Sequence, residues 1–196
     1  MARGADEPRV RVAEDEGQRA LLVDGVVQSV AVEGRTLRGP GYWPAMLPDA
    51  RPRHALLLGL GAGTIAHLLV GRFGPLPIVG VEADPDVLAL ARAEFGLDLP
   101  GLTVVEGDAF EYVASCTERF DYVAVDLYRG ADLQARVLAR PFLRALKRLL
   151  LPGGQIYVNL FLDRRTARRL HRIKQIFPWA EWQPVAKNAV VRCPGR

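Results

Sequence analysis

The residues best suited to chemistry follow apolar, strand-like segments, and the first of them are glycines. Gly59, Gly61 and Gly63 stand in "LLLGLGAGTIAHLL", between an apolar run and a helix-like segment. Glycine allows a sharp turn or the close approach of another group, so this loop either admits a ligand or serves only helix–strand packing. Glu82 ends the next apolar segment, about 20 residues further on, where an acid accepts both ribose hydroxyls in mononucleotide folds.

A second acid extends this nucleotide-like pattern. Asp108 follows the apolar segment 102–106, and its carboxylate could accept the exocyclic amine of adenine while the Ala109 amide faces the ring. The alternative is that Asp108 caps the next helix, and both roles can hold together. The glycine spacing is G-x-G-x-G rather than the G-x-G-x-x-G of dinucleotide sites. The set therefore favours an adenosyl sulfonium over NAD.

A third acid, Asp126, follows the apolar segment "FDYVAV" and would lie beside the sulfonium. A carboxylate there could orient an amine and take its proton as the amine attacks the carbon next to sulfur. The sulfonium is already a good leaving group, so positioning and proton removal are the protein's main tasks. We expect burial to raise the pKa of Asp126 and a nearby Arg129 to lower it, leaving an ionised carboxylate at neutral pH. The alternative is a loop cap after the strand.

These acids can meet only if strand ends share one edge of a sheet. From residue 54 onward short apolar strands alternate with helical segments, which predicts a parallel sheet covered on both faces. The last two strands are too close for a crossover helix and predict an antiparallel hairpin. The expected strands are 54–60, 77–83, 102–107, 120–128, 155–161, 181–186 and 188–193, and the expected helices are 64–72, 85–95, 110–115, 133–151 with an interruption at Pro141, and 164–177.

The predicted fold class is α/β: a Rossmann-like, doubly wound, mostly parallel sheet with a C-terminal antiparallel hairpin. A small N-terminal β-hairpin layer, formed by 9–15 and 19–32, is expected to precede it. We expect residues 1–50 to form this hairpin region and a connector, and residues 51–196 to form the nucleotide-binding domain. The arrangement resembles the class I S-adenosylmethionine (AdoMet)-dependent transferase fold.

Composition narrows the possible classes. The 196 residues are 49% hydrophobic, enough for one core, while two cysteines and three histidines form no disulfide framework and no metal motif. No apolar stretch reaches membrane length and the N-terminus "MARGADEPRVRV" has no apolar signal core, so we expect a cytoplasmic protein without membrane contact. Much of the net charge of +4 lies in residues 163–177. Apolar residues at helical spacing there predict one face that packs on the core: Ala167, Leu170, Ile173 and Phe177. The arginines would then cover a solvated face, and contact with nucleic acid is the less favoured alternative.

The chain resembles spermidine synthase and related polyamine aminopropyltransferases over residues 21–191. "LLVDGVVQSV" resembles the family's N-terminal hairpin, with Gln28 at the position that contacts the nucleoside. "GLGAGT", "VEADP" and "GDAFEYV" resemble its glycine loop, its ribose-binding strand end and its adenine-side motif. "FDYVAVDLY" resembles the segment that carries its catalytic aspartate, which is Asp126 in this sequence. The resemblance also implies that Tyr42, Tyr128 and Arg129 lie at the substrate, and that the protein forms a homodimer.

Three positions depart from the family pattern. Ala62 stands in the glycine loop where spermidine synthases carry an aspartate for the amine of the aminopropyl chain. Arg129 replaces a second aspartate that serves the diamine, and Trp43 replaces a glutamine beside the substrate tyrosine. An arginine where a cationic amine should dock disfavours a simple diamine as acceptor. It could instead pair with a carboxylate of AdoMet or of an acidic acceptor.

The expected function is spermidine synthase-like transfer of an aminopropyl or methyl group from decarboxylated AdoMet or AdoMet to a small acceptor, with no metal. One alternative is a non-catalytic nucleoside-binding or regulatory relative. The other is an AdoMet-dependent methyltransferase acting on nucleic acid. The second is disfavoured because "DLYR" stands where base-amine methyltransferases carry an Asn/Asp-Pro-Pro-Tyr/Phe element.

Overall fold

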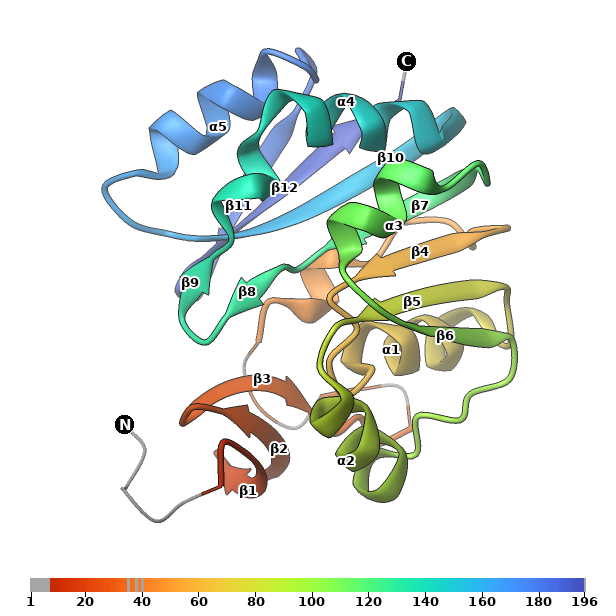
Figure 1. Ribbon diagram of the computed structural model, residues 1–196, viewed down its shortest axis with the longest axis vertical. Helices are drawn as coiled ribbons and strands as arrows, with labels where there is room; N and C mark the ends of the chain where they lie inside the picture. Colours follow the sequence, from red (N-terminus) through yellow and green to blue (C-terminus); the bar gives the residue numbers. More distant parts are fainter. Residues whose placement is uncertain (1–7, 35, 38, 40, 196) are drawn as a thin grey trace.

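The fold centres on a seven-stranded sheet in the order β11-β12-β10-β7-β4-β5-β6 (Figure 1). It is seen in a computed structural model that describes residues 8–34, 36, 37, 39 and 41–195. The expectation about a secretory signal falls partly on residues 1–7, which lie outside this range. In this sheet β12 alone runs opposite to the other strands. The strands are β4 (Ala55–Leu58), β5 (Ile78–Glu82), β6 (Leu102–Glu106), β7 (Phe120–Val125), β10 (Leu150–Phe161), β11 (Glu181–Val185) and β12 (Asn188–Pro194).

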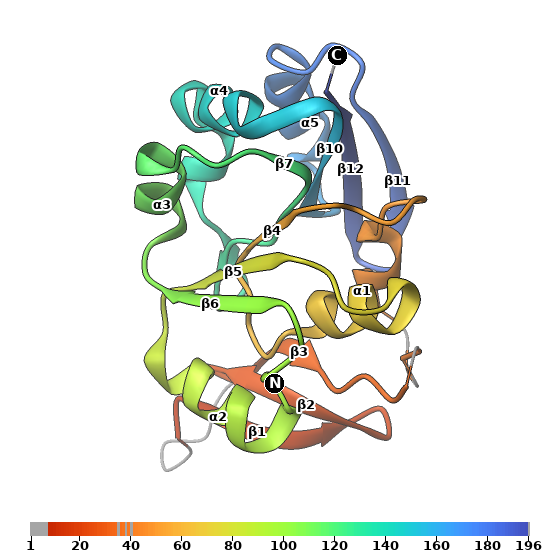
Figure 2. The same ribbon diagram turned by 90° about the vertical axis from the view of Figure 1, so that its right-hand side faces the viewer.

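Helices cover both faces of this sheet, as Figure 2 shows for α1 on one side and α3 and α4 on the other. The helices are α1 (Thr64–Phe73), α2 (Pro85–Phe95), α3 (Ala109–Ser115), α4 (Arg140–Leu149) and α5 (Thr166–Lys174). Leu57 packs in the core under α1 and α2, while its neighbour Leu56 packs in the core under α3, α4 and α5. Successive strand side chains point to opposite faces, so an unbroken apolar strand serves two cores. The predicted doubly wound α/β fold is confirmed.

The connections place a crevice between β4 and β7. The chain leaves β4 for β5 and β6 on one side and then returns to β7 on the other side. In open α/β sheets ligands bind outside the carboxyl ends of the strands at such a switch point. Gly59 follows β4 and Asp126 follows β7, and the Asp126 amide donates to the Leu58 carbonyl at 2.9 Å. The fold therefore brings together Gly59 and Asp126, the first glycine and the last acid of the sequence pattern.

The N-terminal layer is a three-stranded antiparallel sheet of β1 (Val10–Asp15), β2 (Gln18–Val23) and β3 (Val26–Val30). Asp24 and Gly25 turn the chain between β2 and β3 with φ of 50° and 78°, as a tight hairpin turn requires. The sheet lies beside α2 (Figure 1) and contributes Leu21 to the core of α1 and α2. The connector forms a 3₁₀ helix, η1 (Trp43–Met46), whose Trp43 and Met46 are buried in the same core.

Strand β3 is seated on the glycine loop. Ser29 Oγ accepts a hydrogen bond from the Ala62 amide at 2.9 Å. Thr64 Oγ1 accepts from the Val30 amide and donates to the Val30 carbonyl, at 3.0 and 2.8 Å. Gly61 has a φ of +57°, and a Cβ added there would lie 2.4 Å from Ser29 Oγ. Glycine is therefore required at position 61 by the close approach of the N-terminal sheet.

Between β7 and α4 the structure departs from the expected elements. The strand expected over 120–128 ends at Val125, and β8 (Tyr128–Arg129) forms a separate small hairpin with β9 (Asp132–Leu133). The helix expected over 133–151 is divided into η2 (Ala135–Leu138) and α4, because Ala139 is extended. Pro141 lies in the first turn of α4, where a missing amide hydrogen costs little, so it starts this helix rather than interrupting it.

The C-terminal elements differ in their limits. Strand β10 begins at Leu150 rather than 155, with an irregular register before Gln155. Helix α5 is shorter than the expected 164–177, and it buries Leu170 and Ile173 as expected. Ala167 is exposed, whereas Thr166 is buried and its Oγ1 accepts from the Asp163 amide at 2.8 Å. The terminal antiparallel hairpin of β11 and β12 is confirmed.

Gly61→Ala should lower the free energy of unfolding by about 1–3 kcal/mol, because alanine is strained at this φ and its Cβ meets Ser29 Oγ. Chemical denaturation measures the loss. Gly96→Ala is the matched control, because Gly96 has a φ of +62° and nothing within 4 Å of an added Cβ. In a double-mutant cycle, Ser29→Ala should offset part of the Gly61→Ala loss. Equal losses for Gly61→Ala and Gly96→Ala would contradict the seating of β3 on this loop.

Candidate active site

One cleft of about 880 Å³ lies over the switch point. Its walls come from the glycine loop, from the segments that follow β5, β6 and β7, and from the N-terminal sheet. It is lined by nearly all of the residues that the sequence predicts for the site: Gln28, Tyr42, Gly59, Gly61, Glu82, Asp108, Ala109, Asp126, Tyr128 and Arg129. Gly63 is the exception. It is the N-cap of α1, and a Cβ there would meet Leu97 at 2.5 Å, so Gly63 serves helix packing.

The glycine loop faces the cleft and also packs closely against neighbouring residues of the protein. A Cβ on Gly59 would lie 2.2 Å from the Asp126 carbonyl oxygen, so only glycine lets β4 and β7 end so close together. Ala62 is 1% exposed and does not line the cleft. Its methyl group belongs to the core under α1, and its amide is bound to Ser29. The described glycine loop therefore offers no acid to the cleft.

Glu82 is held by three backbone amides at the end of β5. Its Oε2 accepts from Gly61 at 2.9 Å, and its Oε1 accepts from Ala83 and Asp84 at 2.9 and 3.1 Å. Burial raises the pKa of Glu82, and the hydrogen bonds from Gly61, Asp84 and Ala83 oppose that rise. These bonds fix the carboxylate at the cleft wall and tie the glycine loop to β5. A carboxylate in this position is a rigid acceptor for hydroxyl groups of a ligand.

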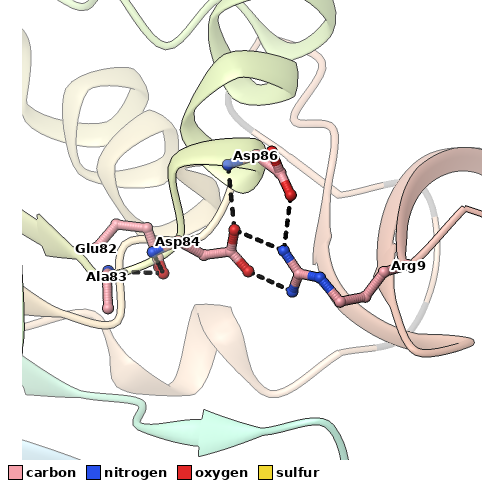
Figure 3. A network of polar contacts seen from close by, with 5 residues as sticks. All are labelled: Arg9, Glu82, Ala83, Asp84 and Asp86. Atoms are coloured by element: carbon pink, nitrogen blue, oxygen red, sulfur yellow. Dashed lines mark hydrogen bonds and ion pairs between the residues drawn. The ribbon is translucent and has the colours of Figure 1, made fainter.

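The N-terminal sheet is clamped to this wall by Arg9 (Figure 3). The guanidinium donates to both carboxylate oxygens of Asp84, at 2.6 and 2.9 Å, and to Asp86 at 2.8 Å. Asp84 is also the N-cap of α2 and accepts from the Asp86 amide. Arg9 holds the pKa of Asp84 below its usual value. The clamp and the cap occupy the Asp84 carboxylate, whereas Glu82 lines the cleft without an ion-pair partner among the described residues.

Asp108 caps α3 and has one oxygen left for other partners. Its Oδ1 accepts from the Phe110 and Glu111 amides at 2.7 and 3.0 Å. Its Oδ2 accepts from Arg136 at 3.3 Å, in a partly exposed pair. The Arg136 guanidinium also lies 4.1 Å from the centre of the Phe110 ring. The capping role is therefore present, and Oδ2 is the atom that a ligand amine would share with or take from Arg136.

Asp126 lies at the bottom of the cleft with a donor on each oxygen. The Tyr42 hydroxyl donates to Oδ2 at 2.6 Å, and Asn159 Nδ2 donates to Oδ1 at 2.8 Å. Burial raises the pKa of Asp126 above its usual 3.8, and the bonds from Tyr42 and Asn159 oppose the rise. Burial together with the Asp126 charge raises the pKa of Tyr42, so its hydroxyl keeps the proton it donates.

The expectation that Arg129 lowers the pKa of Asp126 is wrong. Arg129 is exposed on β8, and the groups that oppose the rise are Tyr42 and Asn159. The loop after β7 turns away from Asp126 to form the β8–β9 hairpin, which is held by Gln28 through its donation to the Gly130 carbonyl at 3.1 Å. Arg129 therefore stands on the wall of the cleft that the N-terminal sheet supports.

Two buried asparagines complete this end of the cleft, and sequence reasoning missed both. Asn159, near the end of β10, donates to Asp126, and Asn188, at the start of β12, donates to Asn159 Oδ1 at 2.8 Å. Lys187, in the turn before Asn188, also lines the cleft. A polar residue inside the apolar segment "YVNLF" was the available signal for Asn159. Asn188 carried no such signal, because it resembles an ordinary turn residue.

Trp43 and Tyr128 complete the end of the cleft around Asp126. Trp43 stacks on Tyr42 with ring centroids 4.6 Å apart, so the position expected for the family's glutamine holds a packed indole. Tyr128 donates to the Asn159 carbonyl at 3.3 Å and packs edge-on against Phe161.

Over residues 8–34, 36, 37, 39 and 41–195, no three of the histidine, cysteine, aspartate and glutamate residues are grouped to hold a metal. In the same residues no helix has the length and apolarity to cross a membrane.

Comparison with known proteins shows that the chain is similar to transferases. Residues 55–154 match the family model described as a methyltransferase domain. A polyamine aminopropyltransferase of Chromobacterium violaceum is 30% identical over 184 residues, covering 87% of this chain and 69% of the relative. The polyamine aminopropyltransferase of Neisseria meningitidis serogroup A is 27% identical over 180 residues, covering 87% of this chain and 68% of the relative.

The fold is shared with solved structures. A spermidine synthase, solved in complex with the transition-state analogue AdoDATO, superposes with a TM-score of 0.76 at 16% identity. The match covers 96% of this chain and 74% of that one, so it includes the N-terminal sheet as well as the seven-stranded sheet. At this level of identity the likeness shows a common fold.

Proposed function

The chain belongs to the polyamine aminopropyltransferase family within the class I AdoMet-dependent transferase fold, and from this premise we propose that it transfers an aminopropyl or methyl group to a small amine acceptor. The donor is an adenosyl sulfonium compound. The observation that carries the proposal is the meeting of Glu82 and Asp126 in one cleft over the switch point. We assign Glu82 to the nucleoside and Asp126 to the proton.

The nucleoside end of the proposal uses three walls of the cleft. Glu82 accepts the ribose hydroxyls with its fixed carboxylate, and Asp108 Oδ2 accepts the adenine amine in place of Arg136. Gln28 uses its amide nitrogen on Gly130, which leaves its carbonyl oxygen for the nucleoside. The transition-state analogue AdoDATO bound to the solved spermidine synthase supports this class of donor.

The chemical step needs one base. The acceptor nitrogen attacks the carbon bonded to sulfur, the carbon–sulfur bond breaks, and its electron pair neutralises the sulfonium to a thioether. The proton lost by the nitrogen goes to Asp126. Each Asp126 oxygen already accepts one hydrogen bond and retains capacity for another, so the carboxylate can orient the amine before it takes the proton. Tyr42 and Asn159 oppose the effect of burial and favour the ionised form that this role requires.

Two departures from the family pattern shape the choice of substrates. The buried Ala62 gives no carboxylate to the free amine of decarboxylated AdoMet, so we propose that AdoMet binds at least as well as the decarboxylated donor. The exposed Arg129 and Lys187 line the cleft and disfavour a simple diamine, because like charges oppose docking. Both residues favour an acceptor that carries an anionic group beside its amine.

Glu82→Ala should weaken the binding of methylthioadenosine by about 5- to 150-fold, the effect of losing about 1–3 kcal/mol when polar partners go unpaired. Isothermal calorimetry measures the affinity. Glu106→Ala is the matched control, because Glu106 is the register partner of Glu82 on β6 but is exposed and does not line the cleft. Equal affinities for the wild type and Glu82→Ala would contradict the ribose assignment.

Asp126→Asn should lower turnover by roughly 10²–10⁴-fold, because the side chain keeps its shape and loses its basicity. Methylthioadenosine affinity should change little. In the wild type, turnover should fall as the pH falls through the Asp126 pKa, since protonation removes the base. That fall should begin at a higher pH than for an ordinary aspartate, because burial raises this pKa. Unchanged turnover in Asp126→Asn, with an acceptor found by screening, would overturn the proposed base.

A further inference from the structure

A chain of three hydrogen bonds links the terminal hairpin to Asp126 and, beyond it, to Tyr42. Asn188 Nδ2 donates to Asn159 Oδ1 at 2.8 Å, and Asn159 Nδ2 donates to Asp126 Oδ1 at 2.8 Å. The Tyr42 hydroxyl closes the chain on Asp126 Oδ2 at 2.6 Å. Asn159 and Asn188 are 2% and 8% exposed, so water competes little for these bonds. Each link therefore constrains the next one.

The direction in which these hydrogen bonds are donated depends on Asn188, the first residue of the chain. An amide group has a donor end and an acceptor end, and the two have nearly the same shape. If the Asn159 amide turned over, its carbonyl oxygen would face the Asp126 carboxylate, and two acceptors would be in contact. The Asn188 amino group prevents this because it occupies the acceptor end of Asn159. We propose that Asn188 is a positioning residue that sets the orientation of the Asn159 amide and thereby keeps a donor on Asp126.

The backbone around Asn188 is suited to this task. Asn188 is paired with Phe161 of β10 and with Val185 of β11, so both neighbouring strands fix its backbone. Ala186 turns the chain just before it with a φ of 50°, and the Lys187 carbonyl accepts from the Leu162 amide at 2.9 Å. The antiparallel hairpin thus has a second role besides completing the sheet: its turn reaches the acid at the end of β7.

The surroundings of Asp126 make its protonation a clean readout. The titratable groups that interact with it in the described structure are Tyr42, Glu82, Tyr122 and Tyr128. None of these four lies on the terminal hairpin. A neutral substitution at position 188 therefore reaches Asp126 through Asn159. The inference rests on the proposed role of Asp126 as base, but its test does not depend on turnover.

The test is a ¹³C NMR titration of the aspartate carboxyl groups, with the Asp126 signal assigned from its absence in Asp126→Asn. In Asn188→Ala the Asp126 pKa should rise by about one unit, because the donor on Oδ1 is no longer held in place. Gln183→Ala removes an exposed amide from the same hairpin and should leave the titration unchanged. In an Asn159→Ala background, Asn188→Ala should add no further shift, since its effect passes through Asn159.

Two outcomes would overturn the inference. One is an Asp126 titration in Asn188→Ala that matches the wild type, and the other is a full additional shift in the Asn159→Ala background. Thermal unfolding shows whether each variant is folded, and Asn188→Ser replaces Asn188→Ala if the latter is not. Failure of the proposed function gives a different result: Asp126→Asn would retain turnover whatever the carboxyl titration shows.

Discussion

The close packing of the glycine loop against three neighbours is the constraint on which the rest of the structure depends. Gly59 lies against the carbonyl of Asp126, Gly61 lies against Ser29 of the N-terminal sheet, and the Gly61 amide is bound by Glu82. These contacts join the ends of β4, β5 and β7 to β3. A side chain at either glycine would separate the walls of the cleft. Glu82, proposed to bind the nucleoside, and Asp126, the proposed base, are therefore positioned by one loop.

The two ends of the cleft hold their carboxylates differently. At the end of β5, Glu82 is held by three amides and Asp84 is occupied by Arg9, so of these two carboxylates Glu82 is the one that remains for a ligand. At the other end the proposed base, Asp126, is held by two side chains, Tyr42 and Asn159, which come from the connector and from β10. Backbone donors make a rigid acceptor, whereas side-chain donors tune a carboxylate toward its ionised form.

Much of the fold and of the candidate site could be predicted from the sequence. A glycine or an acid directly after an apolar strand is visible in the local sequence, and a parallel sheet brings the carboxyl ends of its strands to one edge. Local patterns therefore predict that Gly59, Glu82, Asp108 and Asp126 lie together. Partners brought from distant segments could not be found this way. Asn159 and Asn188 act through contacts that depend on the strand order. The β8–β9 hairpin, which carries Arg129, leaves no clear trace in the sequence, so its effect on the position of Arg129 could not be predicted.

The most direct test of the account is a parallel calorimetric titration of the unmodified chain with AdoMet, decarboxylated AdoMet and methylthioadenosine. The account predicts that all three bind one site per chain, and that AdoMet binds at least as tightly as the decarboxylated donor. Tenfold tighter binding of decarboxylated AdoMet, about 1.4 kcal/mol, would contradict the proposed donor. Absence of binding by all three would contradict the central claim that this cleft is an adenosyl site.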